Sequence, residues 1–218
     1  MKNKGIFISF EGGEGAGKTT QIKRIVSFLQ EKNYDVITTR EPGGTPEAEK
    51  IRDLLVQRDG GDWTPKSECL MFFAARQIHV ERLIKPALNN NKIVITDRFT
   101  DSTRAYQSYG HNLDINFIEE VNKTVLGDFE PDLTFIFDLP IDIGLERSLK
   151  NNIASSDTRE EKEDKFEKLD NKFHENMRQG FLKIAKEHKN RCKLIDATKT
   201  MDEVTKDILF HIKEKIND

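Results

Sequence analysis

Apolar and polar positions along the chain follow two alternating patterns. Short runs rich in apolar and β-branched residues predict five strands, at 6–10, 35–39, 93–95, 133–137 and 193–195. Apolar residues spaced three or four apart predict helices at 22–29, about 51–55, 64 to about 89, 142–150, 166–184 and 201–216. Helices between short buried strands are typical of βαβ units, so we expect an α/β fold with a five-stranded parallel sheet flanked by helices.

One stretch interrupts this alternation. Residues 151–165 are rich in Asn and Ser and then in mixed charges. Two interpretations are open: a solvated loop that leads into a salt-bridged helix start, or a mobile lid over an active site. We interpret residues 1–218 as a single domain, with a lid insert at about 150–166.

Length, charge and cysteine usage exclude several classes of protein. A chain of 218 residues fits one domain, and its net charge of −3 gives no basic surface for nucleic acid. The apolar run Ile6–Phe10 ends at Glu11 and is too short for a signal peptide or a membrane span. Cys69 and Cys192 form neither a disulfide framework nor a zinc pattern. We therefore expect a cytoplasmic protein without nucleic-acid or membrane partners.

The strongest motif is a glycine-rich loop that follows the first predicted strand and precedes a helix. Its sequence fits G-x-x-x-x-G-K-[ST] and comprises Gly12, Gly13, Glu14, Gly15, Ala16, Gly17, Lys18 and Thr19. In such loops backbone N–H groups and the helix N-terminus bind phosphate oxygens. Lys18 is then expected to reach the β- and γ-phosphates of a nucleotide, and the Thr19 hydroxyl to bind Mg²⁺.

A phosphate-binding loop does not by itself name a reaction. A switch GTPase needs an Asn-Lys-x-Asp motif, and the nearest match, 122–125, lacks the Asp. A metal-switch D-x-x-G is also missing after the third strand, where Asp97–Thr100 stand. The size favours a small-molecule kinase. A nucleotide-binding switch without transfer activity remains the alternative from a different class.

Charged residues follow the second and third predicted strands. Asp97 and Arg98 come directly after the third, and the 40–45 segment follows the second, with Arg52 a little further along. The carboxyl ends of parallel strands meet at one edge of a sheet, where ligands bind. Asp97 can hold Mg²⁺ there, and Arg98 can bind phosphate oxygens in a bidentate manner.

Phe72 and Arg76 lie four residues apart on one face of the long predicted helix. An aromatic ring and a guanidinium on one face can stack on a base and hydrogen-bond to its edge. The alternative is core packing for Phe72 and a surface charge for Arg76.

Several segments together resemble the thymidylate kinase family. They are FEGGEGAGKTT at 10–20, TREPGGT at 39–45, FFAAR at 72–76, DRF at 97–99, AYQ at 105–107, and the segments 131–140 and 195–198. The resemblance covers essentially the whole chain. It implies a three-layer P-loop kinase fold with a lid, a homodimer, and Mg²⁺-dependent transfer of phosphate from ATP to dTMP in dTTP biosynthesis. A kinase for another nucleoside monophosphate remains an alternative.

The resemblance also implies how the acceptor is bound. Phe72 would stack on the thymine, while Arg76 and Gln107 would hold its edge. Arg98 and Arg52 would grip the dTMP phosphate. The full set implied for the acceptor is Glu14, Glu41, Pro42, Arg52, Phe72, Arg76, Arg98, Ser102, Tyr106 and Gln107.

Further implied roles concern the sugar, the donor and the metal. Glu14 would approach the 3′-hydroxyl, and Tyr106 would crowd a 2′-hydroxyl. Residues 12–19 and Thr20 would bind ATP, and Arg147 would flank the adenine. Mg²⁺ would be held by Thr19 and Asp97.

The chain departs from the family in the cation that neutralises the migrating phosphoryl group. Gly15 occupies the place in the loop where some members carry Arg, so the cation should come from the lid. There the usual Asp-Arg-Phe-Glu is replaced by a segment with Lys165. We favour Arg159 slightly over Lys165, because bidentate geometry suits a phosphoryl group. The catalytic set is then Lys18, Asp97, Arg98 and one of these two residues.

Overall fold

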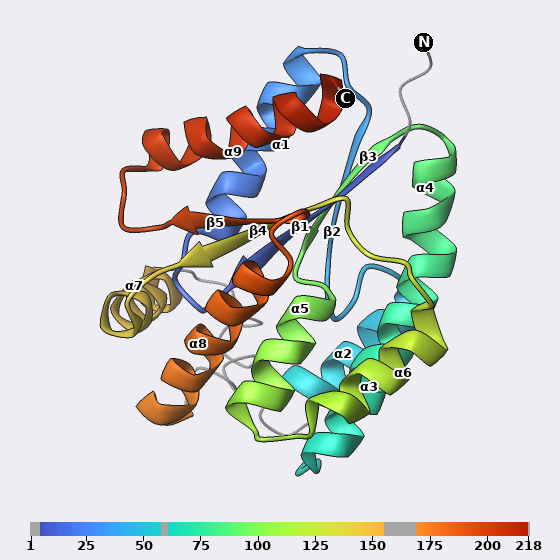
Figure 1. The fold of residues 1–218 in the computed structure, drawn as a ribbon, viewed down its shortest axis with the longest axis vertical. Helices are drawn as coiled ribbons and strands as arrows, with labels where there is room; N and C mark the ends of the chain where they lie inside the picture. The colour runs from blue at the N-terminus through green and yellow to red at the C-terminus, as the bar shows by residue number, and fades with distance from the viewer. Residues whose placement is uncertain (1–4, 58–60, 155–168, 218) are drawn as a thin grey trace.

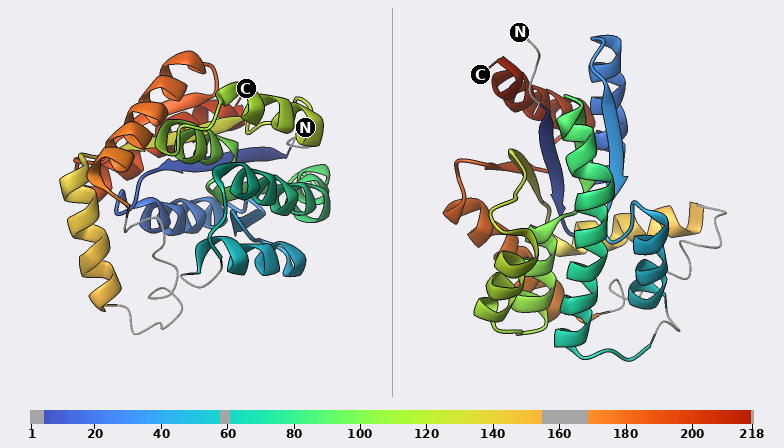
Figure 2. Two further views of the ribbon diagram at one scale, coloured as in Figure 1. Left: turned by 90° about the horizontal axis from the view of Figure 1, so that it is seen from below. Right: turned by 90° about the vertical axis from the view of Figure 1, so that its right-hand side faces the viewer.

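The computed structural model describes residues 5–57, 61–154 and 169–217, and shows a sheet with helices on both faces (Figures 1 and 2). In the described residues the sheet has five parallel strands in the order β2-β3-β1-β4-β5. The strands are β1 (Ile6–Gly12), β2 (Val36–Arg40), β3 (Ile93–Asp97), β4 (Leu133–Asp138) and β5 (Cys192–Asp196). The prediction of five parallel strands is confirmed.

The helices connect successive strands and cover the sheet. They are α1 (Lys18–Glu31), α2 (Pro46–Val56), α3 (Pro65–His79), α4 (Lys85–Asn89), α5 (Thr100–Thr103), α6 (Ile115–Leu126), α7 (Ile141–Ala154), α8 (Asn171–Glu187) and α9 (Met201–Asn217), with π-helical segments η1 (Val80–Ile84) and η2 (Arg104–Gly110). The long predicted helix is α3, η1 and α4 in one run, and Thr64 caps it by accepting from the Ser67 N–H. Within the described segments, no helix combines the length and the apolar character needed to cross a membrane.

Alternate strand residues pack into different helix layers. On one face, Ile8 and Phe10 of β1 join a core with Ile25 of α1 and Ile208 of α9. On the other face, Phe7 of β1 packs with the η1 and α4 helices, while the middle of β4 packs with α8 and η2. This three-layer arrangement places every strand-to-helix loop at the carboxyl edge of the sheet.

β1 is the central strand, at the point where successive connections switch from one side of the sheet to the other. β2 and β3 lie on one side of β1, and β4 and β5 lie on the other. The register pairs Phe10 with Asp97 and Gly12 with Phe137. The glycine-rich loop therefore opens between the ends of β3 and β4, which is where open α/β sheets bind ligands.

The segment of α5 and η2 was not predicted from the sequence. It is almost entirely buried, yet it contains Asp101 and Arg104 rather than an apolar stripe. Its π-helical turns also depart from a period of 3.6 residues. The helix predicted at 166–184 corresponds to α8, which begins at Asn171 and not at 169, because Asp170 caps it by accepting from the Phe173 N–H. Residues 166–168 lie outside the described residues.

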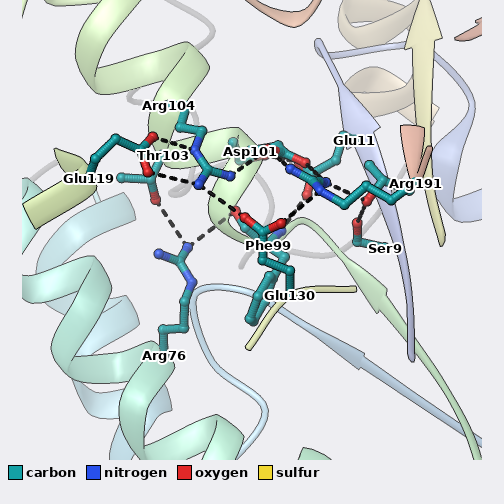
Figure 3. Close-up of polar contacts among 12 residues, drawn as sticks. Ser9, Glu11, Arg76, Phe99, Asp101, Thr103, Arg104, Glu119, Glu130 and Arg191 are labelled. Carbon is teal, nitrogen blue, oxygen red and sulfur yellow. Dashed lines mark hydrogen bonds and ion pairs between the residues drawn. The ribbon is translucent and has the colours of Figure 1, made fainter. Parts of the chain in front are cut away.

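An ion-pair network fixes α5 against its neighbours (Figure 3). Asp101 accepts from Arg104 of η2 at 2.8 Å and from Arg191, just before β5, at 2.6 Å. Arg104 also donates to Glu119 of α6 at 2.7 Å. Burial alone would raise the pKa of Asp101, but its bonds to Arg191 and the charges of both arginines outweigh burial and lower it.

Glu11, near the end of β1, is a second buried carboxyl group. Burial is the main cause that raises its pKa to about 8, and the negative charge of Asp101 adds to it. Its hydrogen bonds from Ser102 and Phe99 and the charge of Arg98 act in the opposite direction. The folded protein therefore holds a proton on Glu11 at pH values where the unfolded chain, with a pKa of about 4.3, has released it.

This difference predicts a pH-dependent loss of stability. Between about pH 4.3 and 8 the native state binds more protons at Glu11 than the unfolded state, so the free energy of unfolding falls as pH rises. In Glu11→Gln this contribution is absent. Urea denaturation at pH 5, 6, 7 and 8 should show a steeper decline for the wild type than for the variant. Parallel declines would contradict the raised pKa.

Candidate active site

The glycine-rich loop is shaped by backbone conformations that other residues rarely adopt. Gly15 has φ +65°, and a Cβ built on it would lie 2.1 Å from the Gly144 carbonyl oxygen of α7. Gly17 has φ +86° and begins α1 without a side-chain cap. The first N–H groups of α1 thus remain open toward the loop, which suits an anionic ligand.

Lys18 lies inside this loop. Its Nζ donates to the carbonyl oxygens of Gly12 at 3.0 Å and Gly13 at 2.8 Å. Burial, reinforced by the positive charge of Arg98, lowers the pKa of Lys18 to about 8. Burial disfavours the charged form of Lys18. A phosphate that approaches the ammonium group would stabilise this charged form, because the two charges are opposite.

A large groove of about 1010 Å³ runs along the loop. It is lined by 15–20, Ile22, Lys23, Val26, Ser27, 38–41, Gly44, Arg52, Leu83, Asp97, Arg98 and Ser148. The loop residues expected to bind ATP from Gly15 to Thr20 all line it, whereas Gly13 and Glu14 line a smaller cavity beside β4.

The residues expected to hold a divalent cation lie together. The Thr19 Oγ1 lies 3.4 Å from the Asp97 Oδ2. The other carboxylate oxygen, Asp97 Oδ1, is buried and has no hydrogen-bond partner in the described parts of the chain. A hydroxyl and a carboxylate with a spare oxygen fit Mg²⁺, which binds few protein ligands and keeps phosphate and water oxygens.

A second cavity, of about 210 Å³, lies on the other side of Arg98. It is lined by Glu14, Glu41, Pro42, Arg52, Val56, Phe72, Arg76, Arg98, Phe99, Ser102, Thr103, Tyr106 and Gln107. All ten residues assigned to the acceptor through the family resemblance are in this set. The structure thus brings together residues from five separate stretches of sequence.

Two hydrogen-bond donors in this second cavity are unused. Arg76 is buried: its Nε donates to Glu41 at 2.6 Å, and its Nη2 donates to Thr103 at 3.0 Å and to the Phe99 carbonyl at 3.2 Å. Its Nη1 and the Gln107 Nε2 are buried without a partner among the residues described. Buried donors without acceptors are costly, so this cavity favours a ligand with oxygen acceptors. Arg76 is not the surface charge of the alternative interpretation.

His79 is a site residue to which the sequence analysis assigned no role. Its Nδ1 lies 3.0 Å from Glu41 Oε1, and its Nε2 lies 2.7 Å from Thr39 Oγ1. An ionised carboxylate can only accept, so Nδ1 carries the proton. His79 and Arg76 therefore hold Glu41 from two sides. The sequence feature that could have indicated this is the spacing of three residues between Arg76 and His79, which puts both on one helix face.

Arg98 separates the two cavities and lines both. Its Nη1 donates to the Gly12 carbonyl oxygen at 2.9 Å, and its Nη2 donates to Glu14 at 3.1 Å. The guanidinium carbon lies 4.9 Å from the centre of the Tyr106 ring, whose hydroxyl donates to Glu14. Burial would raise the pKa of Glu14, but the charges of Arg98 and Lys18 outweigh it and lower the pKa.

Three of the predicted positions concern the donor side and the lid. Arg147 on α7 donates to the Ala197 carbonyl at 3.3 Å, so it lies beside the loop after β5 as expected. Arg159, Lys165 and most of the 150–166 insert lie outside the described residues.

A phosphate-binding loop and a second cavity that share Arg52 and Arg98 in their walls, on a parallel sheet, define a P-loop nucleoside monophosphate kinase. The family model for thymidylate kinase matches residues 10–208. A thymidylate kinase of Caulobacter vibrioides is 46% identical over 202 residues, 93% of each chain, and one of Syntrophotalea carbinolica is 42% identical over 97% of this chain and 96% of its own. The crystal structure of thymidylate kinase from Ehrlichia chaffeensis matches with a TM-score of 0.72 and 36% identity, over 95% of this chain and 98% of that one. This chain belongs to the thymidylate kinase family.

The Glu41 cluster predicts a large stability effect. Glu41→Ala leaves the Arg76 cation buried and unpaired, which costs about 3–5 kcal/mol in similar buried pairs. The matched control is Glu47→Ala, which breaks an exposed, solvent-screened pair with Arg82 and should change the free energy of unfolding little. Urea denaturation measures both. Equal losses would contradict a buried ion pair at Arg76.

Proposed function

We propose that this chain carries out the reaction of its family, ATP + dTMP → ADP + dTDP, in the nucleotide biosynthesis that leads to dTTP, by direct transfer between the two cavities. The observation that carries the mechanism is Arg98, which lines both the groove at the glycine-rich loop and the cavity with the unused donors. One cation at that border can contact both phosphates at once.

The proposed chemistry depends on alignment and charge. The second pKa of a phosphate monoester is about 6, so the acceptor is largely ionised near pH 7 and needs no strong general base. Two anions must instead be held in line against their repulsion. We assign Lys18 to the β- and γ-phosphates of ATP, and Arg98 and Arg52 to the dTMP phosphate.

We assign the magnesium site to Thr19 and Asp97, on the strength of the spare carboxylate oxygen and its nearness to the hydroxyl. When bound, the ion would offset negative charge on the phosphates. The adenine side is assigned to Arg147 and the loop after β5, and Thr20 to the donor phosphates. The cation that completes the site stays a prediction, with Arg159 favoured over Lys165.

The acceptor cavity supports binding of a pyrimidine deoxynucleotide. Phe72 is assigned to stack on the base, and the free donors of Arg76 and Gln107 are assigned to its carbonyl oxygens. Glu14 and Tyr106 form one hydrogen-bonded unit that we assign to the sugar. Ser102 and Pro42 complete the wall of the cavity.

Glu41 takes a different role from the one implied by the resemblance. Both of its oxygens are bonded, one to Arg76 and one to His79. We therefore propose that Glu41 acts on the acceptor through Arg76, by fixing the direction of the guanidinium, and that His79 supports it.

The proposed assembly is a homodimer in the cytoplasm. Exposed apolar side chains at Leu54 of α2, Trp63 and Leu70 of α3 support an interface near these helices. The two free cysteines, both buried, fit a reducing compartment.

The proposed function is tested by ADP release with Mg·ATP and a panel of acceptors: dTMP, dUMP, UMP, dCMP, AMP, GMP and thymidine. We expect a strong preference for dTMP. A preference for another monophosphate would keep the kinase but overturn the base assignments. ATP binding with no turnover on any acceptor would favour a nucleotide-dependent switch.

Replacing Lys18 tests the loop. Lys18→Ala should lower turnover at least a hundredfold, because it removes a preorganised cation from the transferring phosphate. The melting curve should change little, since the hydrogen bonds of Lys18 within the described residues go to loop carbonyl groups. Lys32→Ala, at the exposed end of α1, is the control and should keep full activity. Near-normal turnover in Lys18→Ala would remove the loop from the mechanism.

A further inference from the structure

Arg98 holds an unusual backbone conformation for a residue with a side chain. Its φ is +70°, in the left-handed region, which is strained for a residue other than glycine. Its N–H donates to the Phe10 carbonyl at 2.9 Å, and its carbonyl accepts from the Thr96 hydroxyl at 2.9 Å. A conformation of this kind persists only where neighbouring groups hold it.

Glu11 binds the chain directly after Arg98, at Phe99, and Figure 3 labels Glu11 and Phe99. Its Oε1 accepts from the Phe99 N–H at 2.7 Å, and its Oε2 accepts from the Ser102 hydroxyl at 2.5 Å. One carboxyl group on β1 thus binds the residue after Arg98 and the first turn of α5. Ser102 in turn accepts from Arg98 Nη1 at 3.3 Å.

The placement of Glu11 argues against contact with either substrate. It is fully buried and lines neither the groove at the loop nor the acceptor cavity. An apolar side chain would fill the same space without the cost of burying a carboxyl group. What Glu11 adds is a pair of hydrogen bonds whose targets flank Arg98.

We propose that Glu11 is a positioning residue for phosphoryl transfer, which fixes the strained Arg98 backbone and the start of α5 so that the guanidinium lies between the two phosphates. This inference rests on the proposed function, since it assigns the effect to the dTMP phosphate. Glu11 acts through Arg98 and Ser102 and touches no reacting atom.

Two variants separate the length of the Glu11 side chain from its carboxyl chemistry. Glu11→Gln keeps the length of the side chain, so its carbonyl oxygen still accepts from Phe99 and its amide can donate to the Ser102 oxygen. Glu11→Asp keeps the carboxylate but is one methylene shorter, so it cannot span both Phe99 and Ser102. If Glu11 is a positioning residue, Glu11→Gln should keep activity and Glu11→Asp should lose it.

The experiment compares the wild type, both variants and Ser9→Ala, in steady-state kinetics and in calorimetric binding of dTMP without ATP. Ser9 lies on β1 two residues before Glu11, and its hydroxyl bonds to the Thr134 hydroxyl at 2.9 Å, so Ser9→Ala reports the loss of a buried polar contact on the same strand. For Glu11→Asp we expect kcat/KM for dTMP to fall tenfold or more, as for a lost hydrogen bond to a charged group. KM for ATP should stay within threefold, and dTMP binding should weaken in parallel. Glu11→Gln and Ser9→Ala should stay within threefold of the wild type.

Three outcomes would overturn the role of Glu11. They are an unchanged Glu11→Asp, a Glu11→Gln that loses as much as Glu11→Asp, and equal losses in KM for ATP and dTMP. The first shows that a side chain of this length is not needed, the second that an amide cannot replace the carboxyl group, and the third that the damage is general. A wild type without turnover of dTMP would overturn the proposed function instead, so the two failures are distinguishable.

Discussion

The contact between the Arg98 guanidinium and the glycine-rich loop is the interaction on which the rest of the site depends. Arg98 belongs to the loop after β3, yet it donates to the carbonyl oxygen of Gly12, at the end of β1. This contact exists because β1 and β3 are neighbours in register, with Phe10 opposite Asp97. The strand order thus sets the distance between the glycine-rich loop and the second cavity. The other residues of the loop and of the cavity are arranged around Arg98.

The buried polar groups fall into two kinds. Some are held by paired charges: Asp101 by Arg104 and Arg191, and Glu41 by Arg76 and His79. Others among the cavity-lining residues each have a buried atom without a partner in the described parts of the chain: Nη1 of Arg76, Nε2 of Gln107 and Oδ1 of Asp97. The paired charges fix the direction of the atoms that lack a partner. A ligand can then supply the missing partners with little reorganisation.

Much of the fold and the site was predictable from the sequence, for identifiable physical reasons. Buried parallel strands leave apolar runs, and a phosphate loop requires glycines and a lysine at fixed spacing, so β1, β3 and residues 12–19 were evident. The α5 and η2 segment was not, because it is buried through Asp101 and Arg104 rather than through an apolar stripe. The roles of Glu11 and His79 also escaped prediction: their partners lie 38 to 91 residues away in sequence, and no local pattern encodes such contacts.

The central claim is a single direct transfer across the border at Arg98, and the stereochemistry at the γ-phosphorus tests it most directly. ATP made chiral at that phosphorus by isotopic and sulfur substitution would be turned over with dTMP, and the configuration of the product would then be determined. One in-line displacement predicts inversion. Retention would mean two displacements through a phosphorylated side chain, which would contradict the account.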